Sequence, residues 1–87
     1  MALLSFDCGT TNFKAAIFNA RLGRLAEYAR PTPYTLQNPE RAEMDPEAVW
    51  DCARTVMVEA CRAAGITPRA LRRLSFTSQA QTFAVFA

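Results

Sequence analysis

The chain has 87 residues, of which 51% are hydrophobic and 21% charged, with a formal net charge of +2 at pH 7. The apolar content is too high for a disordered segment, and the net charge is too small to indicate a nucleic-acid or membrane-surface partner. Three cysteines without a CxxC pair, and no histidine, argue against a zinc site and a disulfide framework. No secretory signal or membrane-spanning apolar run is visible, so we expect a cytoplasmic protein.

The N-terminal third of the sequence predicts three strands joined by short connections. Residues 3–6 are a short apolar run, and residues 13–18 are apolar at both alternating positions, as in a sheet covered on both faces. Residues 19–24 carry turn-forming side chains, and residues 25–30 can return as a third strand. Together these segments predict an antiparallel meander.

A proline-containing loop is expected over residues 31–44, and a helix follows it. Asp45 can cap this helix by accepting a hydrogen bond from its first turn, and Pro46 suits the first helical position. Gly65 suits the C-terminal end. The apolar residues between them recur at spacings of three and four, which predicts about 18 helical residues, roughly 27 Å long, with one face in the core. Trp50 is expected to widen this apolar stripe.

The remaining sequence predicts a single helical turn and a further strand. Thr67-Pro68 repeats the cap-then-proline signal before a turn over residues 69–71, and a strand is expected over residues 73–77. Residues 83–86 resemble the beginning of another strand. We therefore expect the 87 residues to be a truncated part of a longer chain.

The stretch FDCGTTNFK, residues 6–14, places small and polar residues between the first two predicted strands. Asp7, at the tip of a buried strand, can face a magnesium ion directly or through its waters. Gly9 permits a tight turn and a close approach of the backbone to a ligand. Backbone N–H groups, hydroxyls and an amide can donate to phosphate oxygens, and Lys14 adds positive charge. The candidate phosphate-binding set is Gly9, Thr10, Thr11, Asn12 and Lys14.

The same residues also suit an ordinary hairpin turn that binds nothing. Neither the Walker pattern GxxxxGK[ST] nor GxGxxG occurs in the sequence, so the segment is not one of those phosphate-binding loops. The residues alone therefore leave both readings of the turn open.

Three segments of the chain, in order, resemble those of a known family. FDCGTTNFKAAIFN resembles the first phosphate-binding segment of the actin, Hsp70 and hexokinase ATPase superfamily. RAEMDPEAVW, with Glu43, Asp45, Pro46 and Trp50, resembles the E-x-D-P-x-x-x-W segment of the FGGY carbohydrate kinases. LSFTSQAQTF falls where glycerol kinases and xylulokinases have a strand followed by a sugar-contacting loop.

The resemblance implies an α/β fold of the ribonuclease-H-like, actin-type ATPase kind, in its N-terminal part only: an antiparallel strand meander, a long helix and a further strand. Residues 1–87 would be the N-terminal part of the first domain of an FGGY kinase. Complete enzymes of this family bind ATP and Mg²⁺ between two such domains and transfer the gamma-phosphoryl group to a hydroxyl of a sugar or polyol. Asp7 would be the acid associated with the metal, and the phosphate-binding set would hold the nucleotide.

Gln79, Ala80 and Gln81 are the substrate-contacting candidates by this resemblance. Glycerol kinases place an Arg-Glu pair directly after the glutamine that matches Gln79, where this chain has Ala80-Gln81. Xylulokinases commonly place Met-His there, followed by glycine, where this chain has Thr82. We therefore expect a ketose or another sugar rather than glycerol.

The resemblance assigns no catalytic residue to this chain, because the family's general base lies downstream. We expect the 87 residues alone to be inactive. The expected partners are a sugar or polyol substrate and the remainder of the kinase chain, without nucleic acid or membrane, and homodimerisation of the complete enzyme is left open. The alternatives are a non-catalytic nucleotide-binding or interaction module of the same superfamily, and a small α/β interaction domain.

Overall fold

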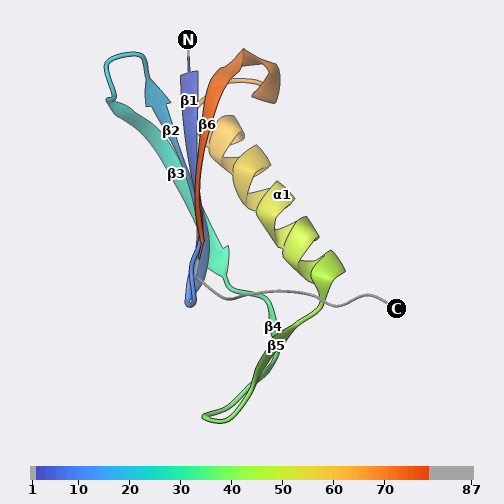
Figure 1. The fold of residues 1–87 in the computed structure, drawn as a ribbon. Helices are drawn as coiled ribbons and strands as arrows, with labels where there is room; N and C mark the ends of the chain where they lie inside the picture. Colours follow the sequence, from blue (N-terminus) through green and yellow to red (C-terminus); the bar gives the residue numbers. More distant parts are fainter. Residues whose placement is uncertain (1, 79–87) are drawn as a thin grey trace.

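The computed structural model describes residues 2–78 of the chain. Residue 1 and residues 79–87 lie outside this range, and with them the strand expected at 83–86 and the substrate candidates Gln79, Ala80 and Gln81. Figure 1 shows a twisted sheet with one long helix along one of its faces and a narrow two-stranded hairpin beyond one end. The elements are β1 (Ala2–Cys8), β2 (Asn12–Asn19), β3 (Arg24–Pro31), β4 (Tyr34–Gln37), β5 (Ala42–Met44), α1 (Pro46–Ala63), the 3-10 turn η1 (Pro68–Ala70) and β6 (Leu71–Ser78).

The main sheet has the strand order β3-β2-β1-β6. β1 pairs antiparallel with β2, and β2 antiparallel with β3, which confirms the predicted meander. β6 pairs in parallel with β1 on the other side. A parallel neighbour needs a long crossover connection, and α1 lies within the segment that crosses from β3 to β6.

The core lies between α1 and one face of the sheet. Alternate residues of a strand point to opposite faces, so Leu4 and Phe6 of β1 meet the helix together with Phe13 and Ile17 of β2. Phe6 and Phe13 stack edge to face with ring centroids 6.0 Å apart. Each such buried side chain contributes about 1.5–3 kcal/mol relative to exposure. The helix contributes Ala53, Val56, Ala60 and Cys61.

Both ends of α1 form where the local signals predict them. The Asp45 carboxylate accepts a hydrogen bond of 3.3 Å from the Ala48 N–H, and Pro46 is the first helical residue. At the other end Gly65 adopts a φ of +71°, which favours glycine. The Ile66 N–H donates to the Cys61 carbonyl at 3.0 Å, which completes a Schellman-type cap.

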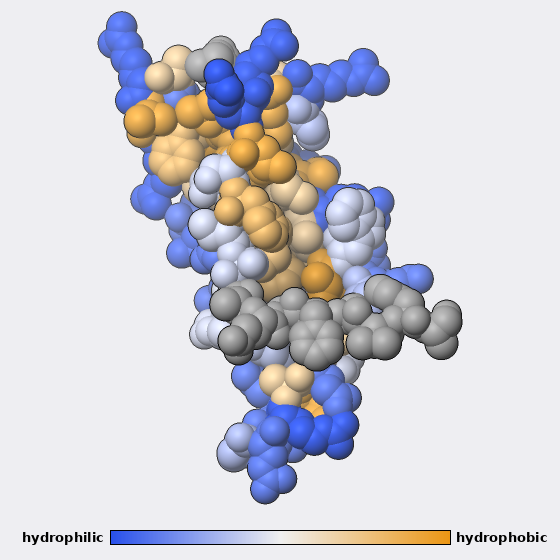
Figure 2. All heavy atoms as spheres, viewed as in Figure 1, coloured by the Kyte–Doolittle hydropathy of each residue, from blue (hydrophilic) through white to orange (hydrophobic). Residues whose placement is uncertain are grey.

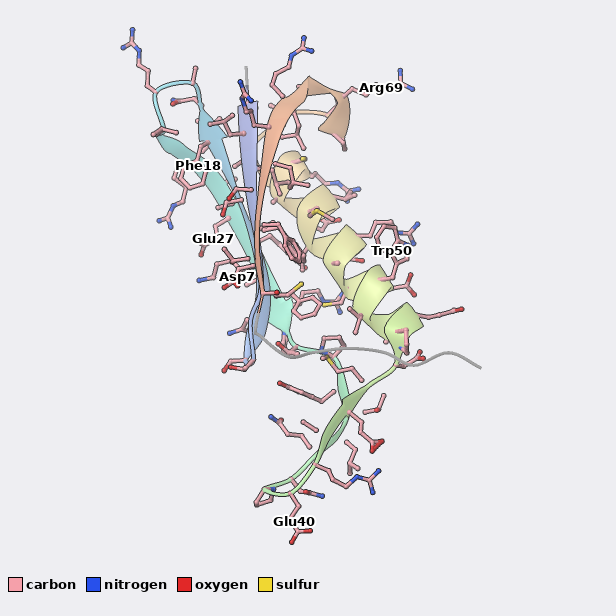
Figure 3. All side chains as sticks on the ribbon, viewed as in Figure 1. Asp7, Phe18, Glu27, Glu40, Trp50 and Arg69 are labelled. Carbon is pink, nitrogen blue, oxygen red and sulfur yellow. The ribbon has the colours of Figure 1, made fainter. Side chains whose placement is uncertain are left out.

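The expectation that Trp50 widens the apolar stripe is wrong, since its exposed fraction is 63%. At the helical angle of about 100° per residue, Trp50 lies about 120° around the helix from the buried Val56. Figure 3 places it on the side of α1 away from the strands. Small residues form most of the helix–sheet contact instead.

The prediction of a loop over residues 31–44 is also wrong, because this segment contains the antiparallel pair β4–β5. Its prolines do not interrupt the pairing: Pro31 ends β3, Pro33 lies before β4, and Pro39 lies in the turn. Asn38 closes that turn by accepting hydrogen bonds from the N–H groups of the two residues after Pro39.

In residues 2–78 no helix is long and apolar enough to cross a membrane.

Candidate functional site

Asp7 lies on the face of the sheet opposite α1. Its neighbours Phe6 and Cys8 point toward the helix, so strand alternation turns the Asp7 side chain to the open face, where it is exposed. The strand continues to Cys8, one residue further than the expected strand tip. Figure 3 shows Asp7 near the end of β1.

Two neighbouring strands bring polar side chains beside Asp7. The Thr77 hydroxyl of β6 donates to the Asp7 carboxylate at 3.0 Å, which fixes one of its two oxygens. Lys14 of β2 is the direct cross-strand partner of Asp7, so both side chains lie on the open face of the sheet. Asn12 lies two residues before Lys14 and shares that face. The structure therefore brings Asp7, Lys14 and Asn12 to one end of one sheet face.

Gly9 closes the turn between β1 and β2, which comprises residues 9–11 and is called the β1–β2 turn below. The Gly9 N–H donates to the Asn12 carbonyl oxygen at 3.0 Å. A Cβ atom at position 9 would lie 2.8 Å from that same oxygen, closer than real Cβ contacts. A side chain at position 9 would therefore force the backbone to move.

Residues 32–34, which sequence reasoning did not select, hold the carbonyl groups of this turn. The Thr32 hydroxyl donates to the Gly9 carbonyl at 2.7 Å, and the Tyr34 hydroxyl donates to the Thr10 carbonyl at 2.8 Å. The Thr32 N–H donates to the Thr11 carbonyl at 2.9 Å. The sequence indicates the role of Thr32 and Tyr34 only weakly, through two hydroxyl-bearing residues that alternate with prolines in Pro31-Thr32-Pro33-Tyr34.

Cys8 immediately precedes the turn, and burial raises the pKa of its thiol, with a further contribution from the neighbouring Asp7 carboxylate. A raised pKa keeps the thiol protonated at neutral pH, and the thiolate is the reactive form. Cys8 also packs against the hydrophobic core. Packing, rather than nucleophilic chemistry, is therefore its role in this site.

Asp7 offers a single carboxylate as a candidate ligand for a metal ion. Within residues 2–78 no group of three or more histidine, cysteine, aspartate or glutamate residues is placed to hold a metal. One carboxylate with an oxygen not bound to Thr77 suits Mg²⁺, which usually keeps several waters and takes its other ligands from substrate phosphates. The residues present therefore fit a metal shared with a phosphate ligand.

A separate apolar groove of about 430 Å³ lies on the helix side of the sheet, between α1 and β6. Leu4, Met57 and Leu74 are among its lining residues. Figure 2 shows hydrophobic atoms gathered in the middle of this view of the molecule, between hydrophilic ends. Leu4 and Asp7 point to opposite faces of the sheet, so this groove is distinct from the polar end that carries Asp7.

Comparison with known proteins identifies the family. Residues 2–87 match the model of the N-terminal domain of the FGGY family of carbohydrate kinases. The chain is 34% identical over 84 residues to the glycerol kinase of Citrifermentans bemidjiense, which covers 97% of this chain and 17% of that protein. It is 32% identical over 77 residues to a probable L-xylulose kinase of Haemophilus influenzae, which covers 87% of this chain and 16% of that protein.

Solved structures of sugar kinases also match the fold of this chain. The xylulose kinase of Rhodospirillum rubrum matches with a TM-score of 0.73 and 29% identity, over 92% of this chain and 16% of that one. The gluconate kinase of Lactobacillus acidophilus matches with a TM-score of 0.74 and 20% identity, over 90% of this chain and 15% of that one, which shows the fold alone. The expected α/β architecture, an actin-type N-terminal part, is thereby confirmed. The chain belongs to the FGGY family of carbohydrate kinases and matches their N-terminal domain.

Proposed function

We propose that this chain is the N-terminal part of the first domain of an ATP-dependent carbohydrate kinase, which transfers the gamma-phosphoryl group of ATP to a hydroxyl of a sugar or polyol. The chain spans 16–17% of the length of the curated relatives named above, so most of the enzyme would lie beyond these residues. The observation that carries the proposal is the polar end of the sheet, where Asp7, Lys14 and the β1–β2 turn lie together. The proposed setting is the cytoplasm, and the remainder of the kinase chain is the proposed partner.

Each residue of this end has a role in the proposal. The turn N–H groups and the Thr10 and Thr11 hydroxyls bind nucleotide phosphates, with the Asn12 amide and the Lys14 ammonium beside them. Asp7 holds Mg²⁺, directly or through water, and the ion offsets the negative charge of the phosphates when it is bound. Phosphoryl transfer depends mainly on positioning and charge stabilisation, which donors of these kinds supply. The general base is proposed to lie in the rest of the enzyme.

Within this proposal we assign a ketose, rather than glycerol, as the acceptor. The support is the sequence of residues 79–81, where Ala80-Gln81 replaces the Arg-Glu pair of glycerol kinases. The 34% identity to a glycerol kinase argues against it, and the identity to a probable L-xylulose kinase is 32%. A panel of ketoses and polyols, including glycerol, assayed for kcat/KM with the full-length enzyme decides between them. A higher value for glycerol than for every ketose would reject the assignment.

Gln81 is proposed to contact an acceptor hydroxyl. Replacing Gln81 by alanine removes a neutral donor and acceptor without changing the charge. We expect kcat/KM to fall by about five- to hundredfold for an acceptor that it binds, while the KM for ATP is unchanged. The same loss for every acceptor, or no loss for any, would contradict this role.

The experiment that tests the kinase proposal is Asp7→Asn in the full-length enzyme. The substitution keeps the shape of the side chain and one oxygen donor but removes the negative charge, so the metal is held much more weakly. We expect kcat to fall about a hundredfold, which corresponds to roughly 3 kcal/mol, with sugar binding in the absence of nucleotide unchanged. Glu27→Gln is the matched control, because Glu27 is an exposed acid on the same sheet face but on β3.

Full turnover by the Asp7→Asn variant would leave Asp7 as an ordinary residue of the hairpin. A wild-type enzyme that binds ATP but phosphorylates no sugar would favour the non-catalytic module instead. The 87-residue chain alone is expected to be inactive in the same assay, and sugar phosphorylation by it would contradict the proposal that it is only part of the enzyme.

A further inference from the structure

We propose that Thr32 and Tyr34 are positioning residues for the nucleotide: they hold the carbonyl groups of the β1–β2 turn, so that the N–H groups of Thr10 and Thr11 point to the phosphates. The inference rests on the proposed function and extends it to two residues outside the FDCGTTNFK segment.

The geometry of the peptide group transmits the effect. A trans peptide group is planar, and its C=O and N–H bonds point in opposite directions. No peptide bond in residues 2–78 is cis. The Thr32 hydroxyl therefore sets the direction of the Thr10 N–H when it binds the Gly9 carbonyl at 2.7 Å. In the same way, the Tyr34 hydroxyl at 2.8 Å from the Thr10 carbonyl sets the direction of the Thr11 N–H.

The two N–H groups are the donors that this arrangement leaves for a ligand. Within residues 2–78, the N–H groups of Thr10 and Thr11 have no hydrogen-bond acceptor, whereas the carbonyls of residues 9, 10 and 11 are all bound. Successive backbone N–H groups in a turn form a concavity suited to an anion. Donors fixed in advance bind an anion better because no order has to be created at the moment of binding.

The two hydroxyls differ in burial, and we expect them to differ in importance. Thr32 is buried, with an exposed fraction of 7%, so water cannot readily replace its hydroxyl at the Gly9 carbonyl. The bond from Tyr34 to Thr10 is exposed, and water can take over part of its role. Loss of the Thr32 hydroxyl should therefore have the larger effect.

The test uses hydroxyl deletions in the full-length enzyme. We expect Thr32→Val to raise the KM for ATP about tenfold and Tyr34→Phe about threefold, with the KM for the sugar unchanged. Thr32→Ser should restore the wild-type value, because it restores the hydroxyl. Thr35→Val is the matched control for Thr32, since the Thr35 hydroxyl donates to the Glu43 carbonyl within the β4–β5 hairpin. Tyr28→Phe is the control for Tyr34.

Several results would overturn the inference. An unchanged KM for ATP in both variants, or an equal rise in the KM values for ATP and sugar, would reduce Thr32 and Tyr34 to structural residues. If thermal unfolding shows that Thr32→Val does not fold, Tyr34→Phe decides alone, because it removes one exposed hydroxyl and keeps the ring.

The wild-type enzyme separates this inference from the proposed function. If it phosphorylates no acceptor, the proposed kinase activity fails, and calorimetric titration with ADP and Mg²⁺ then tests the positioning role directly. Weaker ADP binding by Thr32→Val than by Thr35→Val supports the role. Equal ADP binding by these two variants, or the absence of ADP binding by the wild type, overturns it.

Discussion

The two turns of the N-terminal meander are stabilised in different ways. In the turn between β2 and β3, the Asn19 side chain accepts hydrogen bonds from Arg21 at 3.0 Å and Gly23 at 2.9 Å, so all the partners lie within five residues. In the β1–β2 turn, the carbonyls are bound by Thr32 and Tyr34, which are 23 and 24 residues away from their acceptors.

The difference concerns which backbone groups remain available. A turn that satisfies its N–H groups with its own side chain has fewer donors to offer a ligand. A turn whose carbonyls are held from outside can keep its N–H groups free and still be fixed in place. The first arrangement suits a connection between strands, and the second suits the phosphate-binding role proposed for residues 9–11.

The largest difference between the turns should appear on adding a methyl group to their glycines. Gly9→Ala places a Cβ 2.8 Å from the Asn12 carbonyl oxygen, which belongs to the backbone and cannot move freely. Gly23→Ala meets only the Asn19 side chain, at 3.1 Å and beyond, and that side chain can shift. We expect Gly9→Ala to destabilise the protein by about 2 kcal/mol and Gly23→Ala by less than about 1 kcal/mol.

Thermal unfolding of the two variants in the full-length enzyme measures this difference, and the KM for ATP should rise only in Gly9→Ala. Equal shifts in the melting temperature of the two variants would mean that the turns are equally tolerant.

A second, smaller effect is expected from Asn19→Ala, which removes both side-chain hydrogen bonds of the β2–β3 turn. We expect a loss of about 1–2 kcal/mol in stability without any change in the KM for ATP, since this turn is not part of the proposed site. Asn38→Ala is the matched control: Asn38 also accepts two backbone hydrogen bonds, but in the peripheral β4–β5 hairpin. A change in ATP affinity in Asn19→Ala would contradict the separation of the two turns.

The smallest expected effect is a dependence of the protein's stability on pH, caused by Cys8, which directly precedes the β1–β2 turn. Burial, together with the neighbouring Asp7, raises the pKa of the Cys8 thiol above its ordinary value of 9.0. As the pH rises, the unfolded chain therefore loses the Cys8 proton at a lower pH than the folded chain does. The stability contributed by the neutral thiol is present below about pH 9 and is lost as the pH rises further.

Melting temperatures measured from pH 7 to pH 10 should therefore fall less in Cys8→Ala than in the wild type. A residual fall is expected in the variant, because burial also raises the pKa values of Cys52 and Cys61. Identical pH profiles for the two proteins would show that Cys8 does not contribute. The β2–β3 turn contains no cysteine and should not contribute to this dependence.

The elements that could be predicted from the amino-acid sequence are those with local signals. Asp45, Pro46 and Gly65 act on backbone groups within a few residues of themselves, so the bounds of α1 followed from chemistry that does not depend on the rest of the fold. Alternation and turn residues likewise predicted the meander, and the residues around Asp7 predicted a polar turn after a buried strand.

Features that join segments distant in the sequence could be seen only in the folded chain. The β4–β5 pairing was missed because prolines in a short segment suggest a loop, and the structure places them outside the paired residues. The exposure of Trp50 depends on which face of α1 meets the sheet, and small alanines set that face. Thr32 and Tyr34 could not be selected, because a hydroxyl has no local signal for an acceptor that lies more than twenty residues away.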